Sequence, residues 1–302
     1  MRWVDAHREA MVAAADTHEE LELDTFERID VFDALTRLGL KLMFRPLQGC
    51  AALYLPAALG GRPGAIVHAG HPLATQRYSA GHEGGHHVFD HGGQIDRDTE
   101  PRLTGRELGP FEKLAEAFAA WFLMPPEAAE TAMGRLGLAA IATPVDAYAL
   151  SLRLGTSYQA TCVHLPSLKL LKGPVADEWM KARLRDVKQE LSDDPPPGGW
   201  RNDVWAVTAA DAAAVLVVRA GDRLLFDRAG ATVAELPAGA TCTVLAGRTL
   251  LEPPRLCVDL RDGVDAGPAM ITLQDAGETV TFSLAVERPR LGRFVPAAAV
   301  AR

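Results

Sequence analysis

The sequence predicts an α+β protein in which a helix-rich part is followed by a β-rich domain. Up to residue 192, apolar residues recur mostly with helical spacing, and short strand-like runs are grouped between residues 40 and 68. The run Asp193-Asp-Pro-Pro-Pro-Gly-Gly cannot continue a helix and indicates a linker. After residue 200, short β-branched and apolar runs alternate with Gly and Asp turns, a pattern typical of a β domain.

Two helices and a small sheet are predicted in the first 70 residues. Residues 2–18 are rich in Ala, Met and charged residues and predict an amphipathic helix. A second helix is predicted from Ile29 to Leu38, with Asp30 as its N-cap and Gly39 as its end. Short apolar runs separated by Pro and Gly turns then predict the strands of a small antiparallel sheet. These runs are Leu40–Phe44, Ala51–Leu55 and Ala65–His68.

Two further helices are predicted on either side of residues 90–109. The first is predicted over residues 79–89 and is closed by Gly92 and Gly93. The second is predicted over residues 110–123 and stops at Pro125, because proline cannot continue a helix.

Residues 135–192 predict a helical, helix-turn-helix-like segment. Helical runs over residues 146–154 and 158–165 flank a tight turn at Gly155. A single charged helix is predicted to follow over residues 177–191.

The last hundred residues predict an antiparallel β-rich domain of unknown role. Its strands are expected at Ala214–Arg219, Leu224–Phe226, Thr241–Leu245, Ala269–Leu273 and Thr279–Val286. The expected division of the chain is therefore a first domain at 1–134, a helical segment at 135–192, a linker at 193–199 and a β-rich domain at 200–302.

The composition is that of an ordinary globular protein. Hydrophobic residues make up 48% and charged residues 23% of the chain. The formal net charge of -8 argues against a nucleic-acid binder over the whole surface, although a locally basic patch stays open.

The cysteines and the hydrophobic runs indicate a reducing, aqueous compartment. Cys50, Cys162, Cys242 and Cys257 are far apart and form no CxxC pair, so we expect reduced thiols, most of them buried. The first residues lack the apolar region of a signal peptide, and no run approaches the roughly 18 to 20 apolar residues of a membrane span. We therefore expect a cytoplasmic protein without a membrane partner.

The histidines point to a metal site. The run His82-Glu83-Gly-Gly-His86 is an HExxH motif, and on a helix residues i and i+4 lie on one face, so both imidazoles can reach one ion. Zinc accepts neutral imidazole and lowers the pKa of a bound water towards 7. Glu83 is placed to take that proton and deliver it to a leaving amine. The same motif also arises by chance, and its two glycines weaken a helix by roughly 1 kcal/mol each.

A catalytic zinc site needs a third protein ligand. The metzincin arrangement requires a glycine and a histidine three and six residues after His86, where this chain has Phe89 and Gly92. The thermolysin-like arrangement takes a glutamate from a later helix, and the helix over residues 110–123 offers Glu112 at the edge of a stripe of small and apolar residues. Glu116, one turn later, is its competitor, and both could equally be solvated surface acids.

Two segments around these residues follow a known pattern. The first is Arg77-Tyr-Ser-Ala-Gly-His-Glu-Gly-Gly-His, and the second is Glu112-Lys-Leu-Ala-Glu-Ala-Phe-Ala-Ala-Trp-Phe-Leu-Met-Pro. Together they resemble the ImmA/IrrE-type metallopeptidases of bacteria and their mobile elements. That family shows Arg-aromatic-Thr-x-Ala-His-Glu-x-Gly-His, then Glu-x-x-Ala-Asn-x-Phe-Ala and Leu-Met-Pro. The resemblance covers residues 1–130 and, more loosely, 144–171.

The resemblance implies a role for four residues. His82, His86 and Glu112 are the implied metal ligands, and Glu83 is the implied general base. The implied fold is a minimal thermolysin-like zinc peptidase domain, with a small sheet, the HExxH helix and the glutamate helix.

This chain departs from the family pattern at several positions. Glu116 replaces the usual Asn, Gly81 replaces the usual Ala, and Asp90 stands where many members have another His. These differences concern the surroundings of the ligands. His87 and His91 are expected to point off the ligand face, as groups behind the ligands or at the surface.

A group that stabilises the oxyanion of the reaction is also expected. The sequence does not identify it, and His164, Tyr158 and Arg77 are equal candidates.

Three functions compete at this point. The resemblance implies a zinc-dependent endopeptidase that cleaves a specific regulatory protein, typically a helix-turn-helix transcriptional repressor, in a stress or mobile-element response. The alternative is a DNA-binding transcriptional regulator with a structural zinc site, which would read DNA with residues 144–171. Against it, that region and its edge carry only Arg153, Lys169 and Lys172 as fixed positive charges, and few base-reading side chains. The third is a scaffold that acts through the β domain. Glu83 disfavours both rivals, because a structural zinc site has no use for a base.

Overall fold

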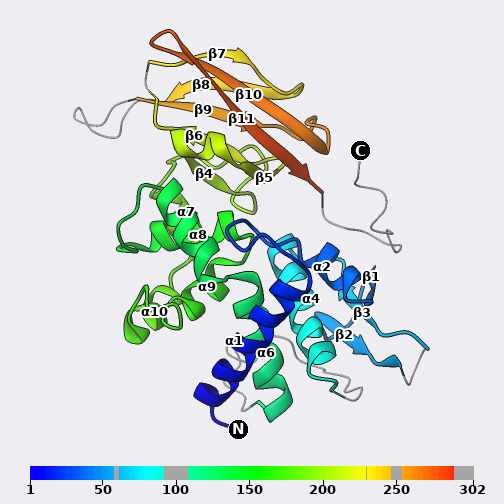
Figure 1. Ribbon diagram of the computed structural model, residues 1–302. Coiled ribbons are helices and arrows are strands. Elements are labelled where there is room, and N and C mark those ends of the chain that lie inside the picture. The colour runs from blue at the N-terminus through cyan, green and yellow to red at the C-terminus, as the bar shows by residue number, and fades with distance from the viewer. Residues whose placement is uncertain (58–60, 92–107, 229, 246–253, 289–302) are drawn as a thin grey trace. The chain divides into compact units, whose positions relative to one another are not determined.

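The computed structural model describes residues 1–57, 61–91, 108–228, 230–245 and 254–288 (Figure 1). The described residues combine helices with small sheets and end in a β-rich part, so the predicted α+β class is confirmed. The chain divides into two compact units. The first contains Met1–Ala129 and Leu154–Ala160, and the second contains Glu130–Arg153 and Thr161–Arg288.

The helices of the first unit follow the predictions closely. Asp30 caps α2 by accepting hydrogen bonds from the backbone N–H groups of Phe32 and Asp33, at 3.1 and 3.3 Å. Helix α4 begins at Leu73, before the predicted start at residue 79. Pro72, with ψ 149°, is not helical and precedes the first turn. The predicted glycine stop at residues 92 and 93 lies outside the described residues. The helices are α1 (Trp3–Glu20), α2 (Val31–Arg37), α4 (Leu73–Val88) and α6 (Pro110–Leu123).

The small sheet of the first unit has the three predicted strands, but one pair of neighbouring strands is parallel. Its strands β1 (Lys41–Arg45), β2 (Ala52–Leu55) and β3 (Gly64–His68) lie in the order β1-β3-β2. Strand β2 is antiparallel to β3, whereas β1 is parallel to β3. The prediction of an antiparallel sheet was therefore wrong. Strand β3 lies between β1 and β2, and because the chain runs in the opposite direction in β2, β1 and β3 run in the same direction.

Helices α4 and α6 pack directly against each other, and a glycine makes this possible. A Cβ atom on Gly85 would lie 2.8 Å from the Cα of Ala115 and 3.2 Å from its carbonyl oxygen. Ala115, Phe118 and Phe122 of α6 are fully buried in the same core. The backbones therefore approach more closely than any residue with a side chain at position 85 would allow.

The region after residue 125 contains more helices than the sequence predicts. Helix α7 was not predicted, and α8 and α9 form the expected helix, turn and helix. The predicted single helix over residues 177–191 was wrong, because Arg183 adopts an extended backbone with ψ 120° and separates two short helices. The helices are α7 (Pro126–Arg135), α8 (Pro144–Leu154), α9 (Tyr158–His164), α10 (Gly173–Trp179) and α11 (Leu184–Gln189).

The β-rich part of the second unit consists of two four-stranded sheets around one apolar core. The strand orders are β5-β11-β10-β7 and β4-β6-β9-β8. The β-rich character is confirmed and most strand pairs are antiparallel as expected, but each sheet also has one parallel pair, β5 with β11 and β4 with β6. Strands β4 and β6 are neighbours in one sheet, whereas β5, which lies between them in the chain, belongs to the other sheet.

Three of these strands, β4, β7 and β9, were not predicted. The strands are β4 (Val204–Val207), β5 (Val215–Arg219), β6 (Arg223–Phe226), β7 (Thr232–Glu235), β8 (Ala240–Leu245), β9 (Arg255–Leu260), β10 (Gly267–Asp275) and β11 (Glu278–Glu287). A 3-10 turn at Ala209–Ala213 precedes β5.

Side chains of α8 and α11 make polar contacts with a charged pair at the start of β4 and the end of β5. The Nζ of Lys188 lies 2.9 Å from one carboxylate oxygen of Asp203, and a guanidinium nitrogen of Arg219 lies 2.6 Å from the other. The hydroxyl of Tyr148 donates a further hydrogen bond to Asp203, at 3.0 Å. We call Tyr148, Lys188, Asp203 and Arg219 the ion cluster.

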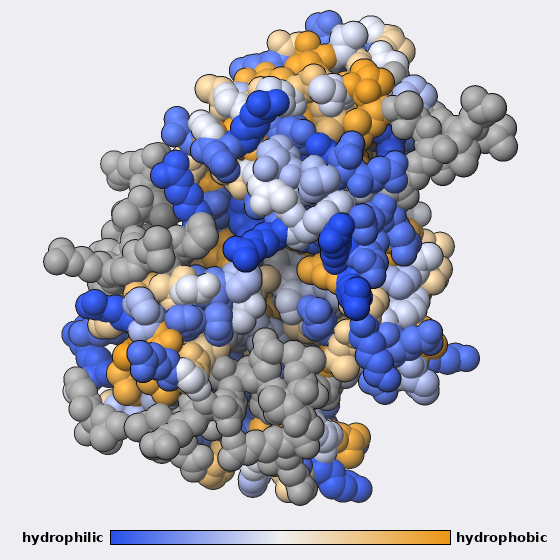
Figure 2. All heavy atoms as spheres, turned by 180° about the vertical axis from the view of Figure 1, so that it is seen from behind, coloured by the Kyte–Doolittle hydropathy of each residue, from blue (hydrophilic) through white to orange (hydrophobic). Residues whose placement is uncertain are grey.

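The surface of the described residues shows scattered apolar side chains. Val215, Val244 and Met270 of the β-rich part are 57%, 62% and 50% exposed. Figure 2 shows hydrophobic atoms at the top of the view and in other places on this face, among hydrophilic ones. Single exposed apolar residues of this kind are common on globular proteins. Within the described ranges, none of the helices combines the length and the apolar character that a bilayer crossing requires.

The four cysteines all have free thiols. Cys162 and Cys257 are buried, whereas Cys50 and Cys242 are partly exposed, so half of the cysteines are buried where most were expected to be.

Candidate metal centre

The four predicted site residues lie on two packed helices of the first unit. His82, Glu83 and His86 belong to α4, and Glu112 lies in the first turn of α6, just after Pro110. Their residues are only 7%, 2%, 4% and 9% exposed, respectively. Ionisable side chains are seldom buried to this degree unless they are paired or bind a metal.

The lone-pair donors of these residues converge. The Nε2 atoms of His82 and His86 lie 3.1 Å apart. The carboxylate of Glu112 spans the pair, with one oxygen 3.1 Å from Nε2 of His82 and the other 3.2 Å from Nε2 of His86. Donor atoms of the three residues all lie within 4.8 Å of one another, so His82, His86 and Glu112 fit as ligands of a single metal ion.

The second ring nitrogen of each histidine faces a different partner. The Nδ1 of His82 lies 3.4 Å from a carboxylate oxygen of Glu116. The Nδ1 of His86 lies 2.9 Å from the Nδ1 of His91, which is itself buried. Both arrangements occupy Nδ1 and leave Nε2 directed at the centre of the cluster, as a metal-binding imidazole requires.

Burial and neighbouring charges shift the pKa values of the three histidines in different directions. Burial lowers the pKa of His82, but the carboxylates of Glu112, Glu116 and Glu83 outweigh it and raise the pKa well above its usual value. Burial lowers the pKa of His86, with hydrogen bonding to Glu112 acting against it. A metal ion would therefore replace a proton that His82 holds between carboxylates.

His91 stays neutral near pH 7. Its burial and the proximity of His86 lower its pKa to about 4. The Nδ1 of a neutral imidazole can accept a hydrogen bond from the Nδ1–H of His86, so it can support that residue without adding charge.

His87 and Arg77 are engaged elsewhere. The Nδ1 of His87 lies 3.2 Å from the hydroxyl of Tyr54, and its Nε2 lies 3.3 Å from the carbonyl oxygen of Leu38. Arg77 donates to the carbonyl oxygens of Gly155 and Ile29, at 2.8 and 2.6 Å. Arg77 therefore holds backbone segments together in the described geometry.

The other candidates for an oxyanion group are buried, with His164 at 1% and Tyr158 at 2% exposure.

Two tyrosines near the cluster were not singled out by the sequence. Tyr78 lies one turn before His82 on α4, and its hydroxyl donates to a carboxylate oxygen of Glu116 at 3.0 Å. The ring of Tyr54 on β2 stacks on that of His86, with 6.3 Å between centroids. The i, i+4 spacing of Tyr78 and His82 is a signal that could have found the first; nothing local in the sequence marks the second.

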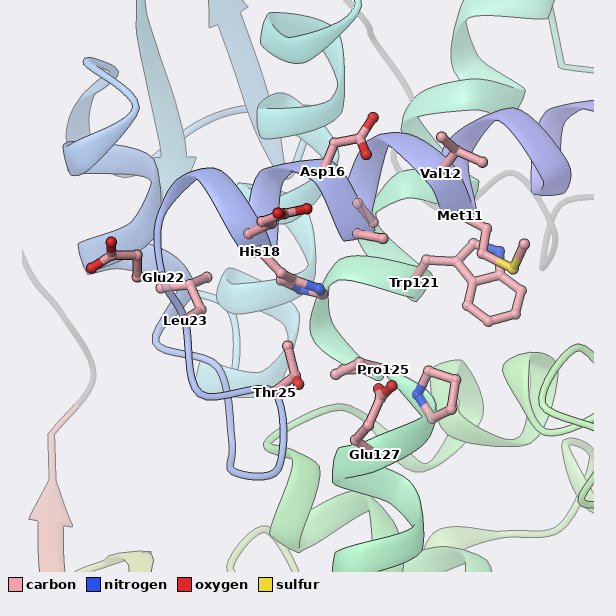
Figure 3. A pocket seen from close by; sticks show the side chains of 14 residues that line it. Met11, Val12, Asp16, His18, Glu22, Leu23, Thr25, Trp121, Pro125 and Glu127 are labelled. Carbon is pink, nitrogen blue, oxygen red and sulfur yellow. The ribbon is translucent and has the colours of Figure 1, made fainter.

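A separate groove lies at the other end of α6 (Figure 3). It has a volume of 720 Å³ and is lined by residues of α1, of the segment that follows it and of the α6–α7 junction, including Met11, His18, Trp121 and Glu127. His82, His86 and Glu112 are not among the residues that line it. His18 is held in place there by stacking on Phe122 and by a 2.9 Å contact with its carbonyl oxygen.

Comparison with known proteins points to the same part of the chain. Residues 35–165 match the family model described as the IrrE N-terminal-like domain, a peptidase family. The matched range contains His82, Glu83, His86 and Glu112.

Among curated proteins, none matches the chain. One solved structure, described as a Mycobacterium tuberculosis transcriptional regulator, is 14% identical with a TM-score of 0.35. The alignment covers 85% of this chain and 79% of that chain. A similarity this low carries no argument about fold or function.

Proposed function

Because residues 35–165 match the model of the IrrE N-terminal-like peptidase domain, we propose that the chain is a zinc-dependent endopeptidase. His82, His86 and Glu112 are the proposed zinc ligands, and Glu83 is the proposed general base. The observation that carries the proposal is the convergence of two imidazole nitrogens and a carboxylate within 3.2 Å of one another beside Glu83.

The choice of zinc rests on the donor set and its spacing. Two histidines and one glutamate form the protein ligands of thermolysin-type catalytic zinc. Zinc bonds of about 2.0 to 2.1 Å in a tetrahedron place neighbouring donors about 3.3 Å apart. The separations of 3.1 to 3.2 Å between the donors of this cluster support that fit.

Each residue of the site has a distinct part in peptide hydrolysis. A zinc ion, when bound, supplies Lewis-acid activation of the attacking water and of the peptide carbonyl. Glu83 accepts the proton of the water and passes it to the leaving amine, and its burial keeps that transfer away from bulk solvent. His82, His86 and Glu112 hold their positions because α4 and α6 pack closely at Gly85.

The substrate part of the proposal rests on the family resemblance. It names a specific regulatory protein, such as a helix-turn-helix transcriptional repressor, which is cleaved in the cytoplasm during a stress or mobile-element response. A regulator encoded beside this chain is the first candidate to test.

The alternative of a DNA-binding regulator receives little support from α8 and α9. Arg153 makes a buried ion pair with Asp211 at 2.6 Å, so its charge is used inside the protein. The hydroxyl of Ser157 accepts a hydrogen bond from the backbone N–H of Ala160, at 3.1 Å, and so caps the seven-residue helix α9. Both groups are therefore engaged within the protein and would have to leave these partners to contact DNA.

The variant Glu83→Gln tests the proposal. A general base contributes to turnover but does not hold the metal, so the variant should keep its zinc and its fold. Cleavage of the candidate regulator should fall by about 100- to 10,000-fold. The readouts are zinc content, thermal unfolding and the rate at which the purified regulator is cut.

Two outcomes would contradict the enzyme proposal. One is a Glu83→Gln variant that cuts at the wild-type rate. The other is a variant that reproduces every wild-type effect in cells, because the chain would then act by binding.

A further inference from the structure

Glu116 lies one helical turn after Glu112 on α6 and faces the same histidine from behind. One of its carboxylate oxygens is 3.4 Å from the Nδ1 of His82, whereas Glu112 approaches the Nε2 of that ring. The side chain of Glu116 is 16% exposed. His82 is thus held between two carboxylates that contact opposite nitrogens.

Tyr78 fixes the Glu116 carboxylate in this orientation. Its hydroxyl is 3.0 Å from the second carboxylate oxygen of Glu116 and 3.2 Å from the Glu116 carbonyl oxygen. Tyr78 and His82 are one turn apart on α4, so one helix supplies both the ligand and the group that orients the ligand's partner.

We propose that Glu116 is a positioning residue, which accepts the Nδ1–H of His82 and thereby directs Nε2 of that ring to the metal. Glu116 does not itself bind the metal in this assignment. A carboxylate behind a metal-binding imidazole fixes its tautomer and ring orientation and increases its basicity. The inference rests on the metal site proposed above.

The two histidine ligands are therefore supported unequally. His82 has a carboxylate partner, Glu116, whereas His86 has an imidazole partner, His91, at 2.9 Å. An anionic acceptor forms the stronger hydrogen bond with an N–H donor. We expect the removal of the Glu116 charge to weaken metal binding while the three ligands remain in place.

The test measures the zinc dissociation constant of the full chain by competition with a chromophoric chelator. Glu116→Gln keeps the size of the side chain but removes its charge, and should weaken zinc binding by about 10- to 100-fold. Tyr78→Phe should weaken it in the same direction and by less. Glu130→Gln, at an exposed position outside the cluster, is the matched control and should leave the constant unchanged.

Cobalt supplies a second readout that loss of stability alone would not move. The visible absorption bands of the Co²⁺-loaded protein depend on how the ligands are arranged around the ion. These bands should shift in Glu116→Gln and stay constant in Glu130→Gln at full occupancy.

The possible failures are distinguishable. A wild-type chain that binds no zinc refutes the proposed function and this inference together. A wild-type chain that binds zinc, with wild-type affinity and cobalt bands in both Glu116→Gln and Tyr78→Phe, overturns only the role of Glu116. A zinc-bound structure with Glu116 on the metal would do the same.

Discussion

The metal centre and the ion cluster of this protein pair their carboxylates with different groups. In the metal centre, the closest approaches join imidazole nitrogens to carboxylates and to other imidazoles, as at His82, His86 and Glu112. In the ion cluster of the second unit, the carboxylate of Asp203 meets the fixed cations of Lys188 and Arg219. The first cluster is rich in lone pairs, whereas the second carries its positive charge within the chain.

This difference supports the proposal that the first cluster is a site for an external ion, whereas the second is a structural network. Lone-pair donors that converge on one point gain most when a cation joins them. Carboxylates that are already paired with Lys and Arg have no such need, and they contribute to stability only through good geometry and complete hydrogen bonding. The side chains of Asp203 and Arg219 are 19% and 24% exposed, more than those of the three candidate ligands, but the identity of the partners is the main difference between the clusters.

The largest effect on stability should come from breaking the ion cluster. Lys188→Met removes the buried cation of the pair with Asp203, whose side chain is 19% exposed, and the loss of one partner of a fully buried pair destabilises proteins by about 3 to 5 kcal/mol. We expect a value near the low end, because Arg219 and Tyr148 still contact Asp203. Urea unfolding measures the change, and zinc content should stay at the wild-type level.

The exposed Lys181 provides the matched control for this variant, since Lys181→Met should change the free energy of unfolding little. The pH dependence gives a second test. Burial raises the pKa of Asp203, but Lys188 and Arg219 lower it below the usual value of 3.8. The stability that these pairs contribute should therefore be present above about pH 4 and be lost as the pH falls further. Equal stability of the Lys188 and Lys181 variants would remove the contrast between the two clusters.

A smaller loss of stability is expected from a substitution at Gly85, the glycine that lets α4 approach α6 closely. In Gly85→Ala the new methyl group would lie 2.8 Å from the Cα of Ala115, so the backbones must separate. Overpacking of this kind costs about 1 to 3 kcal/mol. Because the two helices carry the ligands, zinc affinity should fall as well.

Gly81→Ala is the control on the same helix. Its methyl group would meet Ala119 and Leu123 at an ordinary 3.5 Å, and alanine favours a helix by about 1 kcal/mol over glycine. Thermal unfolding and zinc affinity should therefore be unchanged or improved. If Gly85→Ala behaved like Gly81→Ala, the close approach of the helices would not be what sets the ligand spacing.

The sequence could predict those features that depend on residues close to one another in the chain. His82 and His86 share a helix face by their spacing, and the bounds of α6 follow from Pro110 at its start and Pro125 after its end. Asp30 was recognised as a cap because its side chain bonds only to the next residues along the chain. The assignment of Glu112 needed the additional pattern of a related family.

Features that depend on distant pairing could not be predicted. Glu116 was weighed only as a rival ligand, because its contact with Nδ1 of His82 depends on how α4 and α6 pack. The parallel pairing of β1 with β3 depends on which strand inserts between the others. The break at Arg183 lies within a run whose helical pattern continues across it, so periodicity alone places one helix there.

The most direct test of the central claim is the zinc content of the full-length protein, purified without added metal and measured by elemental analysis. We expect about one zinc per chain, as a site with three protein ligands holds a single ion. His86→Ala and Glu112→Gln should each lose it, while Glu130→Gln keeps it. A wild-type protein that is empty as purified and takes up no stoichiometric zinc on titration would contradict the account.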